Sequence, residues 1–131
     1  DDLPGTLRAL RGVLRPGGVA SHVVDFRCHG LAEAWNGHYG YGEWSWRLVR
    51  GRRAFAINRV PLCGLRALAA DSGFVELACD AEQEPGGLTR AQVAPAFRAL
   101  SDRELSTACA HLLWRAAEPG EDVRSGGAGA W

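Results

Sequence analysis

Apolar positions along the chain follow two periods, one helical and one extended. Leucine and valine recur at helical spacing over residues 3–14, and apolar residues do so again over 62–72. Each run forms a single apolar stripe, which predicts an amphipathic helix. Stretches of β-branched or alternating apolar residues predict strands over 19–26, 74–79 and 108–116. Because a helix precedes each of the first two strands, the pattern is typical of an α/β fold.

Glycine, proline and capping residues predict where elements begin and end. Pro16-Gly17-Gly18 ends the first helix and turns the chain into the first strand. Thr89 caps a predicted helix that runs to about residue 100, interrupted or delayed by Pro95. Ser101 and Glu104 form a capping box for one further short turn.

The segment 30–56 has no clean period. Glycines separate its aromatic residues, which are Trp35, Tyr39, Tyr41, Trp44, Trp46 and Phe55. So long and aromatic a stretch is unusual for a passive loop, and it predicts an insertion that acts as a lid or as the wall of a pocket. The domain organisation that follows is one domain over 1–117 with this insertion, and a flexible, glycine-rich tail over 118–131.

Composition describes an ordinary globular domain of 131 residues, with 47% hydrophobic residues and no net charge. The absence of an 18-residue apolar run and of a signal peptide predicts a cytoplasmic protein that does not span a membrane. All 15 basic residues are arginine, which is typical of a high-GC bacterial gene. There is no Met, and the chain begins at Asp1, so we expect a fragment of a longer protein or a processed start.

The neutral total hides an asymmetry, because residues 1–66 carry a net charge of +5 and residues 67–131 a net charge of −5. We expect the two halves to compensate each other, the alternative being that the first half meets an anionic ligand or partner. The cysteines lack the spacing of a closed metal site, which predicts buried, reduced thiols and no metal; they are Cys28, Cys63, Cys79 and Cys109.

The order of elements resembles the C-terminal half of a bacterial class I S-adenosylmethionine-dependent methyltransferase. The phrase Leu-Arg-Pro-Gly-Gly at 14–18 and the Ser72-Gly-Phe74 that opens the next strand are both typical of that family. The run Ser21-His-Val-Val-Asp-Phe-Arg-Cys-His29 is similar to Ser-His-x-Ile-Asp-Leu-Arg-Asp-His of one bacterial subgroup, although Cys28 replaces its acidic residue. The "Trp … Asn-Arg" that follows in that subgroup is matched at 46 and 58–59, and the likeness covers about residues 3–116.

The resemblance implies a partial Rossmann-like domain with three layers. Its three strands would be the fifth, seventh and sixth of the family in spatial order, the last one antiparallel, with the first four strands upstream of Asp1. The fifth strand would then have an exposed edge, through which the chain could self-associate.

The same resemblance implies methyl transfer from S-adenosylmethionine to a small-molecule or sugar-like acceptor by the intact protein. The family holds the cofactor with a glycine-rich loop after its first strand and an acidic residue ending its second, and neither lies in this chain. Gly40-Tyr-Gly42 is no substitute, because no apolar strand precedes it. We therefore expect the chain alone to be inactive, which leaves its own status as an enzyme open.

The candidate site lies around the end of the first predicted strand, where ligands gather in open α/β sheets. We assign catalytic roles to Asp25 and His29, with a structural salt bridge or cap as the alternative. Acceptor-binding roles are assigned to Arg27, His22, Trp46, Asn58 and Arg59. The alternative for Arg27 is that it pairs with Asp25, and the alternative for His22 is that it packs within the domain. Residues 58–59 could instead hold the loop in place.

A second function is a non-catalytic binding module that uses the aromatic, arginine-rich segment 30–56. Arginines beside tryptophans could also bind single-stranded nucleic acid, the residues being Trp44, Trp46, Arg47, Arg50, Arg52 and Arg53. A chain without net charge and with one such cluster makes a nucleic-acid partner the weaker expectation.

Overall fold

The computed structural model describes residues 2–53 and 57–123, which form two compact units. The sheet unit comprises Asp2–Val24, Leu62–Asp80 and the chain from Ala110 onward. The loop unit comprises Asp25–Pro61 and Ala81–Cys109. Phe55 and the tail beyond residue 123 lie outside the described residues.

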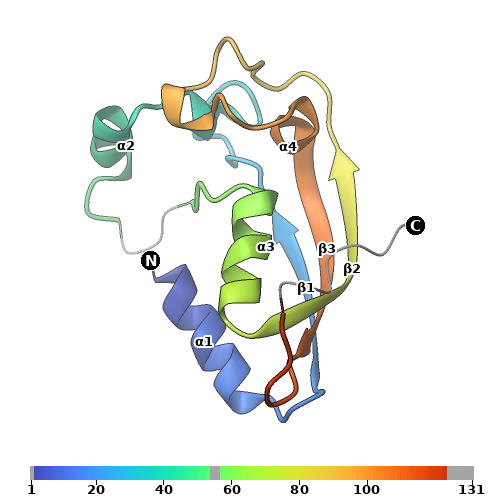
Figure 1. Cartoon of the computed structure of the whole chain (residues 1–131). Coiled ribbons are helices and arrows are strands. Elements are labelled where there is room, and N and C mark those ends of the chain that lie inside the picture. The colour runs from blue at the N-terminus through green and yellow to red at the C-terminus, as the bar shows by residue number, and fades with distance from the viewer. Residues whose placement is uncertain (1, 54–56, 124–131) are drawn as a thin grey trace. The chain divides into compact units, whose positions relative to one another are not determined.

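Three strands form one antiparallel sheet, and together with the helices they make a mixed α/β structure that is compatible with the predicted class (Figure 1). The strands are β1 (Val19–Asp25), β2 (Phe74–Gln83) and β3 (Thr107–Ala116), in the order β1-β3-β2. The N–H of Phe26 donates to the carbonyl of Ala108 at 2.9 Å, and that of Ala117 to Gly73 at 2.9 Å. β3 therefore lies between β1 and β2 and runs opposite to both, which is the predicted order and direction.

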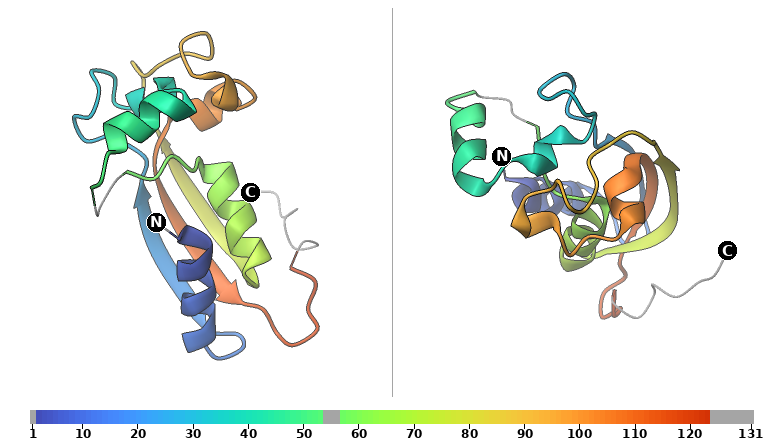
Figure 2. Two further views of the ribbon diagram at one scale, coloured as in Figure 1. Left: turned by 90° about the vertical axis from the view of Figure 1, so that its left-hand side faces the viewer. Right: turned by 90° about the horizontal axis from the view of Figure 1, so that it is seen from above.

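Two helices of the sheet unit, α1 (Leu3–Val13) and α3 (Leu62–Asp71), lie against the same face of the strands (Figures 1 and 2). Asp2 caps α1 by accepting a hydrogen bond from the N–H of Gly5 at 2.8 Å. After α1, Gly17 adopts a φ of +73°, and its N–H donates to the carbonyl of Ala116 at 3.0 Å. The turn predicted from Pro-Gly-Gly thus starts β1 beside β3.

The core of the sheet unit lies on the face of the sheet that α1 and α3 cover. Trp114 packs against Phe74 and His22, with ring centres 5.7 Å and 5.1 Å apart. Leu112 is fully buried beside them on β3. Arg11 donates hydrogen bonds to the carbonyls of Gly73 and Ala117, at 3.2 Å and 2.8 Å, and so ties α1 to the loops at the ends of β2 and β3.

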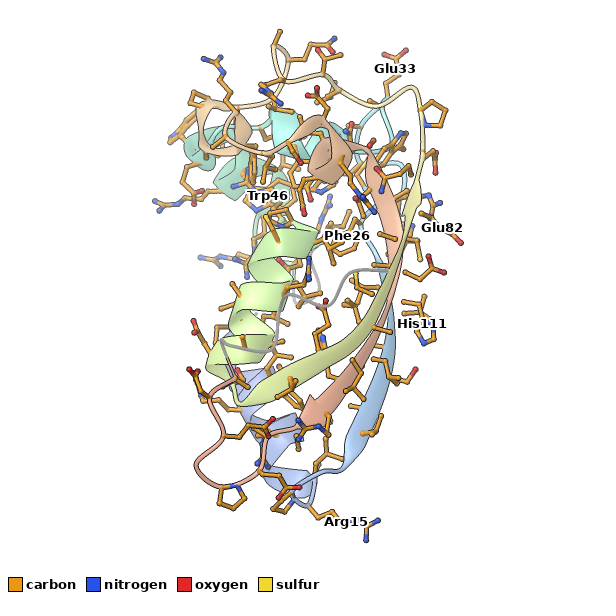
Figure 3. The ribbon with its side chains drawn as sticks, turned by 45° about the vertical axis from the view of Figure 1, so that its right-hand side comes forward. Arg15, Phe26, Glu33, Trp46, Glu82 and His111 are labelled. Carbon is orange, nitrogen blue, oxygen red and sulfur yellow. The ribbon has the colours of Figure 1, made fainter. Side chains whose placement is uncertain are left out.

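The opposite face of the sheet carries Val19, Val23 and Leu77, all exposed, together with His111 (Figure 3). Within the described ranges, the helices of the sheet unit cover one face of the sheet only. The prediction was of a three-layer arrangement. β1 forms one edge of the sheet, as predicted.

The loop unit contains short helices separated by irregular chain. They are η1 (Gly37–Gly40), α2 (Glu43–Arg50), η2 (Pro95–Phe97) and α4 (Asp102–Ser106). The helix predicted over 89–100 is wrong, because Ala94 takes an extended ψ of 154° before Pro95 and only η2 forms. Ser101 caps α4 as predicted, since the N–H of Glu104 donates to Ser101 Oγ at 3.1 Å.

Asn36 joins the two segments of the loop unit. Its Nδ2 donates to the carbonyl of Leu105 at 2.9 Å, and its Oδ1 accepts from the N–H of Leu88 at 2.6 Å. A small apolar core lies in the same unit, formed by Tyr39, Val93 and Leu105 with Leu88, Phe97 and Leu100 against them. The hydrogen bonds of this buried amide hold the irregular segments together, a role that backbone hydrogen bonds between neighbouring strands have in a sheet.

Of the four cysteines, Cys28 is buried as predicted, Cys63 is exposed, and Cys79 and Cys109 are half-buried. No disulfide joins them. The buried environment predicted for all four therefore holds for Cys28 alone. Over the described ranges, no helix has the length and apolar character needed to cross a membrane.

Candidate functional site

The chain leaves β1 through a tight turn that carries His29. The N–H of Leu31 donates to the carbonyl of Cys28 at 3.0 Å, and the two residues between them both have positive φ, +48° for His29 and +79° for Gly30. Positive φ at two central residues is typical of a type I′ turn, and histidine adopts it more readily than branched residues do. The turn leaves the His29 side chain 62% exposed.

Asp25, the last residue of β1, contacts both of the polar side chains that follow it. Its Oδ1 accepts hydrogen bonds from the backbone N–H of Arg27 at 2.9 Å and from Arg27 Nη1 at 3.4 Å. Its Oδ2 lies 3.6 Å from His29 Nε2. That distance exceeds a hydrogen bond, and it suits a charge pair when the imidazole is protonated.

Arg27 is held by two carboxylates. Its Nε donates to Glu84 Oε2 at 2.8 Å, in addition to the contact with Asp25. The hydrogen bond to Glu84 is the main cause that raises the pKa of Arg27. The pairing alternative for Arg27 is thus what the structure shows, and an acceptor-binding role for this residue stays a prediction.

A pocket of about 490 Å³ opens beside the turn. Its lining residues come from the turn, from α2 and from the chain after α2, namely Cys28, His29, Gly30, Leu31, Trp46, Val49, Arg50, Arg53 and Ile57. Of the predicted site residues, His29 and Trp46 line it. Asp25 does not line the pocket, but its Oδ2 lies 3.6 Å from Nε2 of His29, which does.

Arg59 holds together the chain segments around Trp46, which lines the pocket. Its guanidinium donates to the carbonyl of Tyr41 at 2.7 Å and to Glu43 Oε2 at 3.0 Å. Burial lowers the pKa of Arg59, and the contact with Glu43 opposes that shift. Asn58 accepts a hydrogen bond from the N–H of Val60 at 2.8 Å. These contacts are those of a loop tether, and acceptor binding by residues 58–59 stays a prediction.

His22 lies in the sheet unit, whereas the other predicted site residues lie in the loop unit. Its ring packs against Trp114, and its Nε2 is buried without a hydrogen-bond partner. Packing within the domain was the alternative given for His22, and this is its observed environment.

Three functional candidates were missed as such by the sequence reasoning. Arg50 and Arg53 were considered only within the binding-module and nucleic-acid alternatives, although their place in the aromatic segment 30–56 was a usable signal. His38 is fully buried in η1 with both ring nitrogens unpartnered. Burial, with a smaller effect of Arg59, lowers the pKa of His38 to about 4, so this imidazole is neutral at pH 7.

The site can bind a small molecule and exchange a proton through His29. No group of three or more His, Cys, Asp or Glu side chains suited to a metal ion occurs in the described part of the chain. No protein family model, no curated protein and no solved structure matches this chain.

Proposed function

We propose that this chain is the acceptor-binding part of a class I S-adenosylmethionine-dependent methyltransferase. The observation that carries the proposal is the position of His29, which lines the pocket while Asp25 Oδ2 lies 3.6 Å from its Nε2. The acceptor would be a small molecule, in keeping with a pocket of about 490 Å³.

The arrangement of the strands supports this family. The order β1-β3-β2, with β3 antiparallel to both neighbours, is the fifth-seventh-sixth order that the resemblance implies. The turn at Pro16-Gly17-Gly18 leads into β1, and the candidate site follows the carboxyl end of β1, where α/β folds place their ligands.

The proposal gives each side chain a role on the acceptor. His29 would take the proton that a hydroxyl or similar acceptor group loses, and Asp25 would orient and stabilise the imidazolium that forms. Trp46, buried and held under Arg59, would form an apolar wall that excludes water from one side of the acceptor.

The residues described here do not fit the cofactor. Gly40-Tyr-Gly42 joins η1 to α2 instead of joining a strand to a helix. Glu43 occupies the first turn of α2, where its carboxylate would repel the anionic groups that helix N-termini otherwise attract. The proposal therefore assigns S-adenosylmethionine to a part of the protein other than these residues, and the chain alone is expected to be inactive.

The test is transfer of a tritium-labelled methyl group from S-adenosylmethionine to pooled small-molecule acceptors. It uses the protein translated from the gene with the coding sequence that precedes Asp1. The proposal expects labelled product, and an upstream apolar strand that ends in Glu/Asp-x-Gly-x-Gly. A gene without that motif, whose product transfers no label, would overturn it.

A non-catalytic binding module is the second candidate, favoured by the outer side of α2. Trp44 and Leu48, four residues apart on that helix, are 74% and 63% exposed. Exposed apolar pairs of this kind occur at protein interfaces. If the chain is a binding module, replacing both residues by Ser abolishes its interaction with a partner protein. Partner binding that survives the double substitution would count against this function.

A further inference from the structure

The pocket beside His29 has walls that are largely apolar. Leu31, Val49, Ile57 and Trp46 all line it, and Trp46 is only 8% exposed. A ligand that covers these side chains gains free energy in proportion to the apolar surface that it removes from water. A sugar would instead press hydroxyl groups against aliphatic side chains that neither donate nor accept hydrogen bonds, which costs free energy. The pocket therefore favours a ligand with an apolar body over a sugar-like one.

Trp46 favours a flat, aromatic body for this ligand. The guanidinium of Arg59 lies over the Trp46 ring, 4.6 Å from its centre, and so occupies one face. A ligand in the pocket must pack against the other face or the edge of the indole, and both arrangements are ones that pairs of aromatic rings prefer. A volume of about 490 Å³ suits one or two rings. Arg50 and Arg53 complete the lining, and arginine side chains can pack their methylene groups against an apolar ligand.

His29 supplies the polar group that selects a hydroxyl on such a ligand. Its Nε2 lies 3.6 Å from Asp25 Oδ2, which favours the tautomer with the proton on Nε2 and a lone pair on Nδ1. Nδ1 can then accept a hydrogen bond from a ligand O–H. Because the His29 side chain is 62% exposed, this hydroxyl would lie at the open side of the pocket.

The acidity of the hydroxyl separates an aromatic alcohol from an aliphatic one. A phenol such as that of tyrosine has a pKa of about 10, whereas an aliphatic alcohol is a much weaker acid, close to water at about 15.7. Proton transfer to an imidazole is more efficient when the pKa values of donor and acceptor lie closer together. A phenolic hydroxyl therefore suits His29 both as a hydrogen-bond donor and as the proton donor of the proposed function.

We propose that this pocket binds a phenol, whose hydroxyl donates to His29 Nδ1 and whose ring packs against Trp46 and Leu31. The inference narrows the ligand from small molecules in general to aromatic hydroxyl compounds. That the phenol is the methyl acceptor rests on the proposed function, whereas binding itself does not depend on it.

The experiment is an NMR titration of the ¹⁵N-labelled chain. The ligands are 5-hydroxyindole, 5-methoxyindole, which has the same rings without the O–H donor, and methyl glucoside, a sugar. Both indoles should shift the amide signals of Gly30 and Leu31 and the side-chain indole signal of Trp46. 5-Hydroxyindole should bind about fivefold more tightly than 5-methoxyindole, because its hydroxyl makes one further hydrogen bond. Methyl glucoside should shift none of these signals at the same concentrations.

Matched variants separate the hydroxyl contact from the apolar walls. His29→Gly removes the imidazole and suits the positive φ of this position, and the two indoles should then bind with Kd values within twofold of each other. Leu31→Ala should weaken both indoles by a similar factor and keep the ratio of their Kd values. His111→Gln, outside the pocket, should change neither Kd by more than twofold.

Two results of the titration would overturn the proposal. One is that the indoles shift no pocket signal at millimolar concentration. The other is that 5-hydroxyindole binds no more tightly than 5-methoxyindole, or keeps its advantage in His29→Gly.

A transfer assay distinguishes failure of this inference from failure of the proposed function. In the protein translated with the coding sequence that precedes Asp1, we expect methyl label on 5-hydroxyindole and none on methyl glucoside. Label on the sugar alone would overturn the assignment of a phenol and leave the methyltransferase in place. Phenol binding by a protein that labels no acceptor at all would count only against the proposed function.

Discussion

The guanidinium carbon of Arg59 lies 4.6 Å from the centre of the Trp46 ring, so a cation covers one face of the residue that lines the pocket. The same group lies 5.2 Å from the ring of Phe97 and donates a hydrogen bond to the carbonyl of Tyr41. A single, largely buried side chain thus joins α2, η2 and the chain before α2 within the loop unit.

Arg59→Ala should therefore lower the free energy of unfolding by about 2–3 kcal/mol, because it removes a partly buried cation–π contact and two charge-assisted hydrogen bonds. Urea denaturation followed by tryptophan fluorescence measures the change. Arg52→Ala, at an exposed position, is the matched control and should stay within about 0.5 kcal/mol. An Arg59→Ala protein as stable as that control would mean that Arg59 serves a ligand and not the fold.

His38 should make the protein less stable as the pH falls. Its pKa is about 4 in the folded chain and 6.5 when unfolded, so the unfolded state binds a proton first. The contribution of His38 to the free energy of unfolding is fully present above pH 6.5 and is lost as the pH falls towards 4. The loss amounts to about 3 kcal/mol in all. His38→Leu should flatten the curve of unfolding free energy between these pH values, whereas His111→Gln should keep it. A steep decline that survives His38→Leu would show that another group titrates.

Loss of the Asn36 side chain should loosen the loop unit. Asn36→Ala leaves the N–H of Leu88 and the carbonyl of Leu105 without their partner, which costs about 2–4 kcal/mol for a buried site. Hydrogen exchange should show the Leu88 amide exchanging at least tenfold faster in the variant. Equal exchange rates in the two proteins would contradict the role given to Asn36.

Two glycines, Gly12 within α1 and Gly18 in the turn after it, should respond in opposite directions to substitution by alanine. A methyl group on Gly12 would meet nothing within 4 Å, so Gly12→Ala should stabilise the helix by about 0.5–1 kcal/mol. A methyl group on Gly18 would come within 2.8 Å of the carbonyl oxygen of Arg15, so Gly18→Ala should destabilise the turn into β1. Thermal unfolding measures both, and shifts of the same sign would contradict the packing around this turn.

The elements of the sheet unit could be predicted from the sequence because each helix or strand buries one face, which leaves a regular pattern of apolar residues. The stripe that includes Leu7 marked α1, and the alternation that includes Leu112 marked β3. The apolar period cannot show η1 or α2, since α2 buries only Trp46. The same limit misplaced a helix near Pro95, where the local backbone geometry decides the outcome.

The site was predictable only as far as its contacts are local. Asp25, Arg27 and His29 are close in sequence, and their contacts follow from the turn after β1. Glu84 is 57 residues from Arg27, and the apolar pattern of the sequence cannot predict a contact between residues so far apart. The place of Arg50 on the pocket wall likewise depends on how α2 packs in the loop unit, which the sequence pattern does not encode.

The most direct test of the central claim is the rate of methyl transfer by His29→Gln in the protein that includes the preceding coding sequence. Loss of a general base predicts a kcat at least about 100-fold lower. Asp25→Asn should lower it less, since the imidazole remains, and His111→Gln, an exposed histidine of the sheet unit, should leave it unchanged. A His29→Gln enzyme whose kcat stays within twofold of the wild-type value would contradict the account.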